Sequence, residues 1–297
     1  MKPEDHCAHI DLRAPVGELG SGRLRYAAAM HFHASGQLSD AALEVFRICS
    51  ARDSEDPADL LSQRGLINDL PASPDSDGAA VLRAVIAEAD RYLAGLPGPG
   101  IAEVRTLIER WRSGAVTPQS GPPNATVDVY LAPALADLRG GYPALAQSMV
   151  EASPYLKWVT YDIYPANEIG PQFLNGHAFA ALIGEDGAAI EANDFELGFF
   201  MIAPNVLYRD HAHPAPELYA PLTGPHGWRF GVDAPLIVKP AHEPVWNEPH
   251  MPHMTKTGSV PFLCIYSWTR DVNLPAKVIL APDWAELEAI QISDEGA

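Results

Sequence analysis

The chain has 297 residues, 47% of them hydrophobic, and carries a formal net charge of −18 at pH 7. This apolar content is enough for a sizeable core and lies outside the range typical of disordered proteins. The negative charge argues against nucleic acid and against an anionic membrane surface as partners, because both attract cations.

The first half of the sequence is expected to be helical. Two short helices are predicted in residues 22–36 and 39–51, with Ser39 or Asp40 as the N-cap of the second. In "DGAAVLRAVIAEADRYLAGLPGPG" and "IAEVRTLIERWRSG", apolar residues recur at i, i+3 and i+4, which places them on one face of a helix. After a stretch rich in proline and glycine, a further helical pair is expected within residues 132–153.

From about Tyr155 onward, short apolar or alternating runs are separated by Gly, Pro, Asn and Asp. The first run is "LKWVTYDIY", and later examples are "FELGFFMIAP", "ELYAPLTG" and "VPFLCIYSWT". Runs spaced in this way are typical of antiparallel strands in a β-sandwich or barrel. The sequence therefore predicts an α+β protein, with a helical N-terminal region (residues 1–155) followed by a β-domain (residues 156–297).

The N-terminus and the cysteines favour the cytoplasm. The first residues, "MKPEDHCAHIDLRAP", are polar where a signal peptide needs an apolar segment, and no run approaches the roughly 20 apolar residues of a membrane span. The three cysteines, Cys7, Cys49 and Cys264, are not closely spaced. We therefore expect neither a disulfide framework nor a thiolate metal site.

A cluster of metal-binding residue types lies in "YRDHAHPAPELYAPLTG". His211, His213, Glu217 and Tyr219 are all odd-numbered, so on extended strands their side chains can point to the same face. Two imidazoles and a carboxylate suit Zn²⁺ and first-row metals such as Fe²⁺ and Mn²⁺. The pattern predicts a metal site on the wall of the β-domain, holding one divalent ion of open identity.

The spacing of these residues resembles a family motif. His211-x-His213, three residues, Glu217, six residues and Gly224 are similar to the first motif of the cupin superfamily. The resemblance implies a small antiparallel β-barrel, the double-stranded β-helix, with a metal inside its mouth. A further histidine ligand is expected from a later strand, where "WNEPHMPHMTKTG" offers His250 and His253.

The match narrows to one family within the cupins. Tyr208, the run "HPAPELY" and the segment "PHMTKTGSVPFLCIYSWTRD" together resemble the cupin-type dimethylsulfoniopropionate (DMSP) lyases. On that resemblance His253 is the fourth ligand beside His211, His213 and Glu217. The implied activity is that of a carbon–sulfur lyase, which eliminates dimethyl sulfide from DMSP and leaves acrylate.

The implied elimination needs a base and a site for the sulfonium group. Tyrosine is a weak base unless a nearby cation favours its phenolate, and Tyr219 lies two residues beyond a predicted ligand. Tyr208 is the other candidate base. Its even number places it on the opposite face of a regular strand from His211 and His213, so a turn or bulge in "LYRDH" would have to bring it inward. Tyr266 and Trp268 share parity and offer aromatic faces that attract cations, although packing in the core explains them equally well.

Other functions fit the same residues. Two histidines and a carboxylate also suit an Fe²⁺ dioxygenase, or an isomerase that acts on another small acid. A lyase of this family with a different substrate and a barrel that only binds a ligand are further alternatives. The expected partner is a zwitterionic small molecule, and a homodimer remains open.

Overall fold

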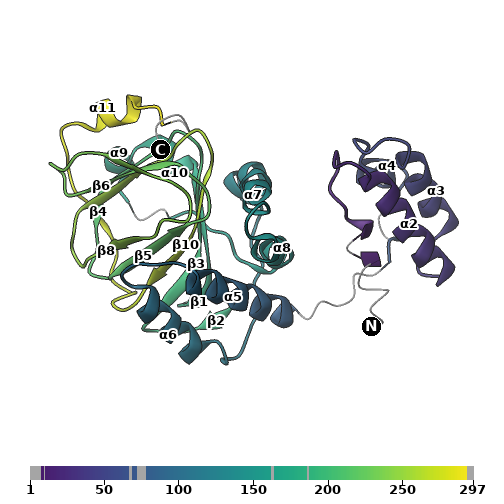
Figure 1. Ribbon diagram of the computed structural model, residues 1–297, viewed down its shortest axis with the longest axis horizontal. Coiled ribbons are helices and arrows are strands. Elements are labelled where there is room, and N and C mark those ends of the chain that lie inside the picture. Colours follow the sequence, from purple (N-terminus) through teal and green to yellow (C-terminus); the bar gives the residue numbers. More distant parts are fainter. Residues whose placement is uncertain are drawn as a thin grey trace. The chain divides into compact units, whose positions relative to one another are not determined.

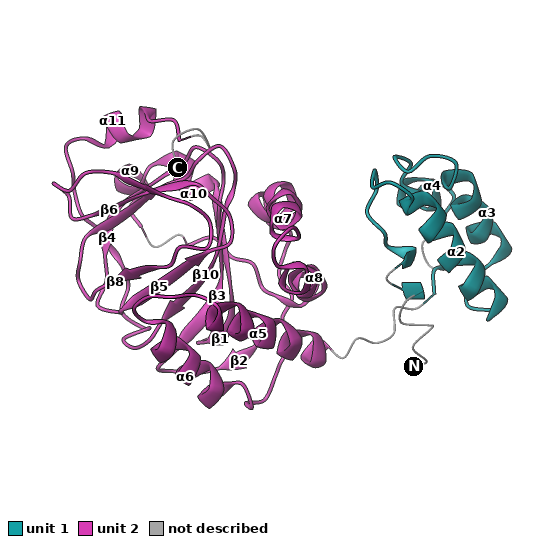
Figure 2. Cartoon of the chain, viewed as in Figure 1, with its two compact units in different colours: residues 1–76 teal, residues 77–297 magenta. Residues whose placement is uncertain are grey.

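The computed structural model describes residues 8–9, 11–66, 69–71, 78–161, 164–185 and 187–292. The chain divides into two compact units, residues 1–76 and residues 77–297 (Figure 2). All residues predicted to form the site lie in the second unit. Cys49 and Cys264 are buried free thiols, whereas Cys7 lies outside the described residues.

The first unit is helical where it is described. It contains α2 (Ser21–Ala34), α3 (Asp40–Cys49) and α4 (Pro57–Gln63). Ser39 caps α3, as predicted, because its hydroxyl accepts a hydrogen bond from the backbone N–H of Ala42 at 3.2 Å. The apolar faces of these helices meet in a small core around Phe32, Val45 and Leu61.

The second unit begins with four helices, of which three lie at the predicted positions and the third in chain order begins at Ala125, seven residues before the predicted span. They are α5 (Gly78–Ala94), α6 (Ile101–Trp111), α7 (Ala125–Leu138) and α8 (Pro143–Ala152). The predicted strand at 156–164 does not form among its described residues, where Val159 makes an isolated bridge with Phe179. Two short helices come next in the chain, α9 (Ala166–Ile169) and α10 (Pro171–Asn175).

Two facing sheets form the β-domain. The first has the strand order β2-β1-β3-β10-β5-β8 and the second has the order β11-β4-β9-β6-β7. All pairings are antiparallel except that of β1 with β2. The strands are β1 (His177–Gly184), β2 (Ile190–Glu191), β3 (Glu196–Ile202), β4 (Leu207–Ala212), β5 (Glu217–Pro221), β6 (His226–Phe230), β7 (Ile237–Lys239), β8 (Val245–Asn247), β9 (His253–Lys256), β10 (Phe262–Trp268) and β11 (Lys277–Val278).

Strand alternation separates an inner core from an outer one. On β3, Leu197, Phe199 and Met201 pack with α5 to α8, whereas Phe200 and Ile202 face the space between the sheets. A terminal helix, α11 (Trp284–Ala289), covers the outer face of the second sheet through Leu287. Figure 1 shows α11 on the opposite side of the strands from α5 and α6. The predicted α+β fold with a cupin-type barrel is confirmed.

The compact units do not coincide with the predicted division at residue 155. Helices α5 to α8 share one continuous core with the first sheet. This core includes Leu82 and Val85 of α5, Leu197 of β3 and Leu263 of β10. Secondary structure does change from helix to strand near that position, but the packing boundary lies at residues 76 and 77. None of the described helices is long and apolar enough to cross a membrane.

Buried neutral histidines make the stability of the second unit sensitive to acid. His226 is 1% exposed; its Nδ1 accepts from the backbone N–H of Gly258 at 3.1 Å, which leaves the proton on Nε2 facing Thr223 Oγ1. Burial lowers the pKa of His226 to about 3. Between about pH 6.5 and pH 3, the unfolded chain therefore binds a proton at His226 that the folded chain does not. The free energy of unfolding consequently decreases as the pH is lowered through this range.

Replacing His226 with glutamine is expected to weaken this dependence. Glutamine can donate to Thr223 and accept from Gly258, but it does not titrate. Between about pH 6 and pH 4, the unfolding free energy of the variant should fall less steeply than that of the wild type, by about 1.4 kcal/mol per pH unit. Urea denaturation at several pH values measures both slopes. If the unfolding free energies of the two proteins fell equally steeply between pH 6 and pH 4, His226 would not be a buried neutral histidine.

Candidate metal centre

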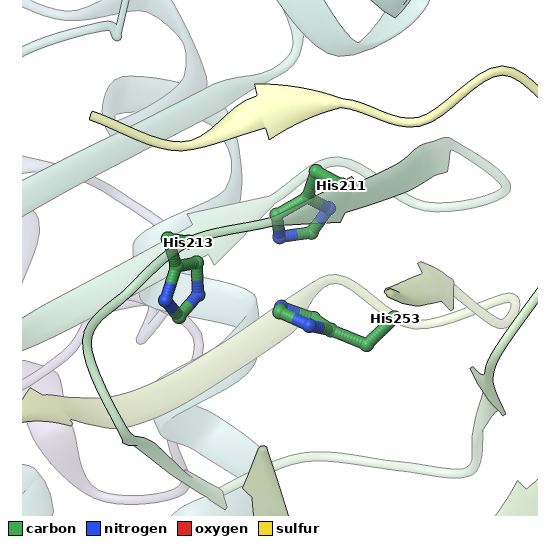
Figure 3. A group of neighbouring side chains, drawn as sticks. All are labelled: His211, His213 and His253. Atoms are coloured by element: carbon green, nitrogen blue, oxygen red, sulfur yellow. The ribbon is translucent and has the colours of Figure 1, made fainter. Parts of the chain in front are cut away.

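Three histidines from two neighbouring strands point toward one another. His211 lies on β4, His213 directly follows that strand, and His253 begins β9, which pairs with β4 so that His211 faces His253. One nitrogen of each ring lies within 4.8 Å of the others, and all three residues are buried. Figure 3 shows the rings converging on one point. The sequence spacing therefore brings His211 and His213 together as expected, and strand pairing adds His253.

Each ring is oriented by its second nitrogen. The Nδ1 atoms of His211, His213 and His253 lie 2.9, 2.8 and 2.9 Å from the backbone carbonyls of Arg209, Ala215 and Met251. A carbonyl only accepts, so Nδ1 carries the proton and the lone pair of a neutral ring is on Nε2. The buried Nε2 atoms of His213 and His253 have no hydrogen-bond partner in the described structure. Unpartnered imidazole nitrogens with anchored Nδ1–H groups are the arrangement found at metal sites.

Glu217 adds a carboxylate to the three imidazoles. It is 2% exposed, and its Oε2 lies 3.3 Å from Nε2 of His213 and 3.3 Å from Nε2 of His253. Asn247 Nδ2 donates to Oε2 at 2.8 Å, and Trp268 Nε1 donates to Oε1 at 2.7 Å. Burial acts to raise the pKa of Glu217, but positive charge and hydrogen bonding at His213 and His253 outweigh it and hold the pKa well below its ordinary value. With neutral rings, a bound cation would supply that positive charge. The donor set of three neutral nitrogens and one anionic oxygen fits a divalent transition metal.

The two histidines proposed for the later motif differ in their surroundings. His253 is 1% exposed and belongs to the cluster. His250 is exposed and has a φ of 61°, and its backbone N–H donates to the carbonyl of His213 at 2.8 Å. His250 therefore shapes the loop beside the cluster through its backbone.

The two candidate tyrosines occupy different positions beside the cluster. Tyr219 is 4% exposed on β5, and burial together with the negative charge of Glu217 raises its pKa well above the ordinary value. The β4–β9 pairing is irregular between Tyr208 and His211, the place where a bulge would be needed to turn Tyr208 inward. The Tyr208 ring stacks on His211 at 3.9 Å, and its hydroxyl lies 2.7 Å from that of Tyr164.

A pocket of about 290 Å³ opens beside the cluster. Both tyrosines and Glu217 line it, as do the predicted substrate-binding residues Tyr266 and Trp268. The polar atoms of those two side chains are already used, since Trp268 Nε1 donates to Glu217 and the Tyr266 hydroxyl donates to Glu196 at 2.6 Å. Only their aromatic surfaces are left to contact a ligand. The pocket thus brings together two phenols, an aromatic wall and Glu217, which is the residue of the metal-binding candidates that lines it.

Comparison with known proteins places the chain in a family. The sequence model of the DMSP lyase family matches residues 101–264, which include the three histidines and Glu217. The chain belongs to the DMSP lyase family. No curated protein matches the sequence.

Solved structures of DMSP lyases share the fold. A structure described as that of the DMSP lyases RdDddP and RnDddQII is 19% identical, with a TM-score of 0.55 over 68% of this chain and 100% of that chain. DMSP lyase DddQ from Ruegeria pomeroyi DSS-3 is 21% identical, with a TM-score of 0.50 over 69% of this chain and 97% of that chain. At this level of identity the likeness establishes a common fold.

Several contacts that shape this pocket were not predicted from the sequence. Asn247 and Trp268 orient Glu217, Tyr164 pairs with Tyr208, and Glu196 pairs with Tyr266. Trp268, Tyr266 and Tyr208 were candidates from the sequence, but Asn247, Tyr164 and Glu196 were not. The contacts join segments far apart in the chain, so spacing within one motif carried no signal for them.

Proposed function

We propose that this protein is a metal-dependent DMSP lyase. The observation that carries the proposal is the buried group of three imidazoles with a carboxylate, Glu217, that also lines a pocket containing Tyr219. His211, His213, His253 and Glu217 would hold the metal. When bound, a divalent cation supplies a Lewis acid for the substrate carboxylate and a positive charge that favours the phenolate of a nearby tyrosine.

Tyr219 is the proposed base. Its phenolate removes a proton from the carbon next to the substrate carboxylate, and the electron pair of that C–H bond forms the new double bond. The bond from the β carbon to sulfur breaks at the same time, and its electron pair leaves with the sulfur. The products are dimethyl sulfide and acrylate, and the proton stays on the Tyr219 oxygen until solvent takes it up.

The remaining pocket residues position these groups. Trp268 and Asn247 hold Glu217 by hydrogen bonds from both sides, which fixes the carboxylate against the imidazoles. Tyr208 packs between His211 and Phe173, with ring centroids 3.9 and 4.0 Å away. These contacts exclude water from one side of the cluster and hold His211 in place, so Tyr208 is the weaker candidate for the base.

A headspace assay tests the proposal directly. Protein loaded separately with Zn²⁺, Fe²⁺ or Mn²⁺ is incubated with DMSP, and dimethyl sulfide is measured by gas chromatography. We expect release with at least one metal, loss of release after chelation, and recovery when the metal is added back. Protein that holds one metal per chain but releases no dimethyl sulfide would refute the proposal. Oxygen consumption by the iron-loaded protein would instead favour a dioxygenase.

A further inference from the structure

The pocket beside the histidine cluster is negatively charged. Its ionisable lining includes Glu185, Glu196 and Glu217, and none of the described residues that line it is lysine or arginine. His177 also lines the pocket, but its ring nitrogens are engaged by the Tyr161 N–H and the Phe173 carbonyl, and burial lowers its pKa to about 4. The described lining of this pocket therefore offers a ligand negative charge and aromatic surface, and it supplies no lysine or arginine.

Glu196 stands out among these acids because it is enclosed but poorly paired. It is the first residue of β3, and among the described residues its carboxylate has one hydrogen-bond donor, the Tyr266 hydroxyl at 2.6 Å. No described lysine or arginine forms an ion pair with it. Burial raises the pKa of Glu196 to about 6, so it is ionised at neutral pH but short of counter-charge. A cation in the pocket would supply that charge.

Aromatic rings pack around Tyr266, whose hydroxyl holds the carboxylate of Glu196, and Phe179 and Phe200 line the same pocket as Glu196. Phe179 and Phe200 lie edge-on to Tyr266, with ring centroids 6.3 and 6.4 Å away. Gly198 makes room for this arrangement, since a Cβ there would lie 2.8 Å from Tyr266 Cε1 and 2.2 Å from the Ala180 carbonyl oxygen. Aromatic rings beside a carboxylate attract methylated onium groups more than they attract neutral groups of the same shape.

Glu196 lies where the cationic group of a short zwitterion would be, if the carboxylate of that ligand were bound at the histidine cluster. Trp268 on β10 pairs with Glu196 on β3 at one side and with Glu217 on β5 at the other. The two glutamates are therefore two strands apart, about 10 Å between backbones, with both side chains directed into one pocket. A three-carbon acid whose carboxylate lies at the cluster would place its β substituent toward Glu196.

We propose that Glu196 is the counter-ion for the positively charged group of the substrate, and that it selects propionates with an onium group on the β carbon. This inference rests on the proposed function, because that function puts the substrate carboxylate at the histidine cluster. Glu196 acts in binding, and Tyr266 positions it. Neutral propionates of the same size would lack this contact.

Two non-reactive ligands of equal shape isolate the charge. 3-(Trimethylammonio)propanoate carries a quaternary nitrogen where 4,4-dimethylpentanoate carries a carbon, and both keep the carboxylate. The Kd of each ligand is measured by calorimetry for two metal-loaded proteins, the wild type and the Glu196→Gln variant. The substitution should reduce the preference for the cationic ligand by about tenfold or more. Binding of the neutral ligand, together with metal content, shows that the variant pocket is intact.

Glu185→Gln is the matched control. Glu185 lines the same pocket but is exposed, so solvent and salt screen its charge. Its removal should change the preference by less than about twofold. An unchanged preference in Glu196→Gln, or an equal loss in Glu185→Gln, would overturn the assignment of Glu196.

The outcome separates this inference from the lyase proposal. A preference that depends on Glu196 in protein that releases no dimethyl sulfide would retain the cation site and refute the lyase activity. If the protein releases dimethyl sulfide but Glu196→Gln leaves the preference for the cationic ligand unchanged, the lyase proposal stands and the role of Glu196 is refuted.

Discussion

Replacing Tyr219 with phenylalanine is expected to lower the rate of dimethyl sulfide release by about 10²- to 10⁴-fold, the usual contribution of a general base. The ring would still fill its place on β5, where the side chain is 4% exposed, so the fold should be kept. The histidines remain, so metal content should not change. The measurement is kcat by headspace analysis, with elemental analysis of the same sample.

Tyr208→Phe is the matched control for this prediction. It also removes one phenol from the pocket, but it leaves the ring stacked between His211 and Phe173. We expect a loss of less than about tenfold, because the Tyr208 hydroxyl is already shared with Tyr164. If Tyr208→Phe lost as much activity as Tyr219→Phe, or more, Tyr208 would become the better candidate for the base.

Replacing Arg229 with methionine is expected to lower the unfolding free energy of the second unit by about 3–5 kcal/mol. Arg229 is 1% exposed and donates to Asp210 from Nε at 3.1 Å and from Nη2 at 2.5 Å, while Nη1 reaches Asp283 at 2.5 Å. Asp210 is fully buried, so loss of the guanidinium would leave its charge without a cation. Urea denaturation of the metal-free protein measures the effect.

Two further variants separate the ion pair from the packing at Arg229. Combining Arg229→Met with Asp210→Leu should cost less than Arg229→Met alone, because no unpaired charge remains in the core. Arg110 forms an ion pair with Asp194 on the surface, so Arg110→Met should cost less than about 1 kcal/mol. A double variant less stable than Arg229→Met would show that the packing of these side chains, and not an unpaired charge on Asp210, accounts for the loss of stability.

Local spacing explains why the sequence could indicate that His211, His213 and Glu217 lie together. His211 and His213 lie at the end of β4 and Glu217 begins β5 in the facing sheet, so a short connection brings them close together. The alternation of side chains along each strand then decides which of them face inward. The helices α5 and α6 could be predicted for a similar reason, since their apolar stripes depend only on residues three or four positions apart. In both cases the information lies in neighbouring residues.

The unpredicted features depend on contacts between distant segments. Glu196 and Tyr266 meet because β3 pairs with β10, and Asn247 reaches Glu217 because β5 pairs with β8. The sequence of either partner does not specify such a pairing. The packing boundary at residue 76 was missed for the same reason, because a helix gives no sign in its own sequence that the surface burying its stripe is a sheet more than 100 residues away.

The position of Trp268 has a practical consequence. Its indole lies 4.5 Å from the ring of His213 and donates its N–H to Glu217, so an ion entering the group of imidazoles changes the electric field around this chromophore. Loading could therefore be followed continuously through the intrinsic fluorescence of unlabelled protein. The same signal would rank competing ions before any turnover is attempted.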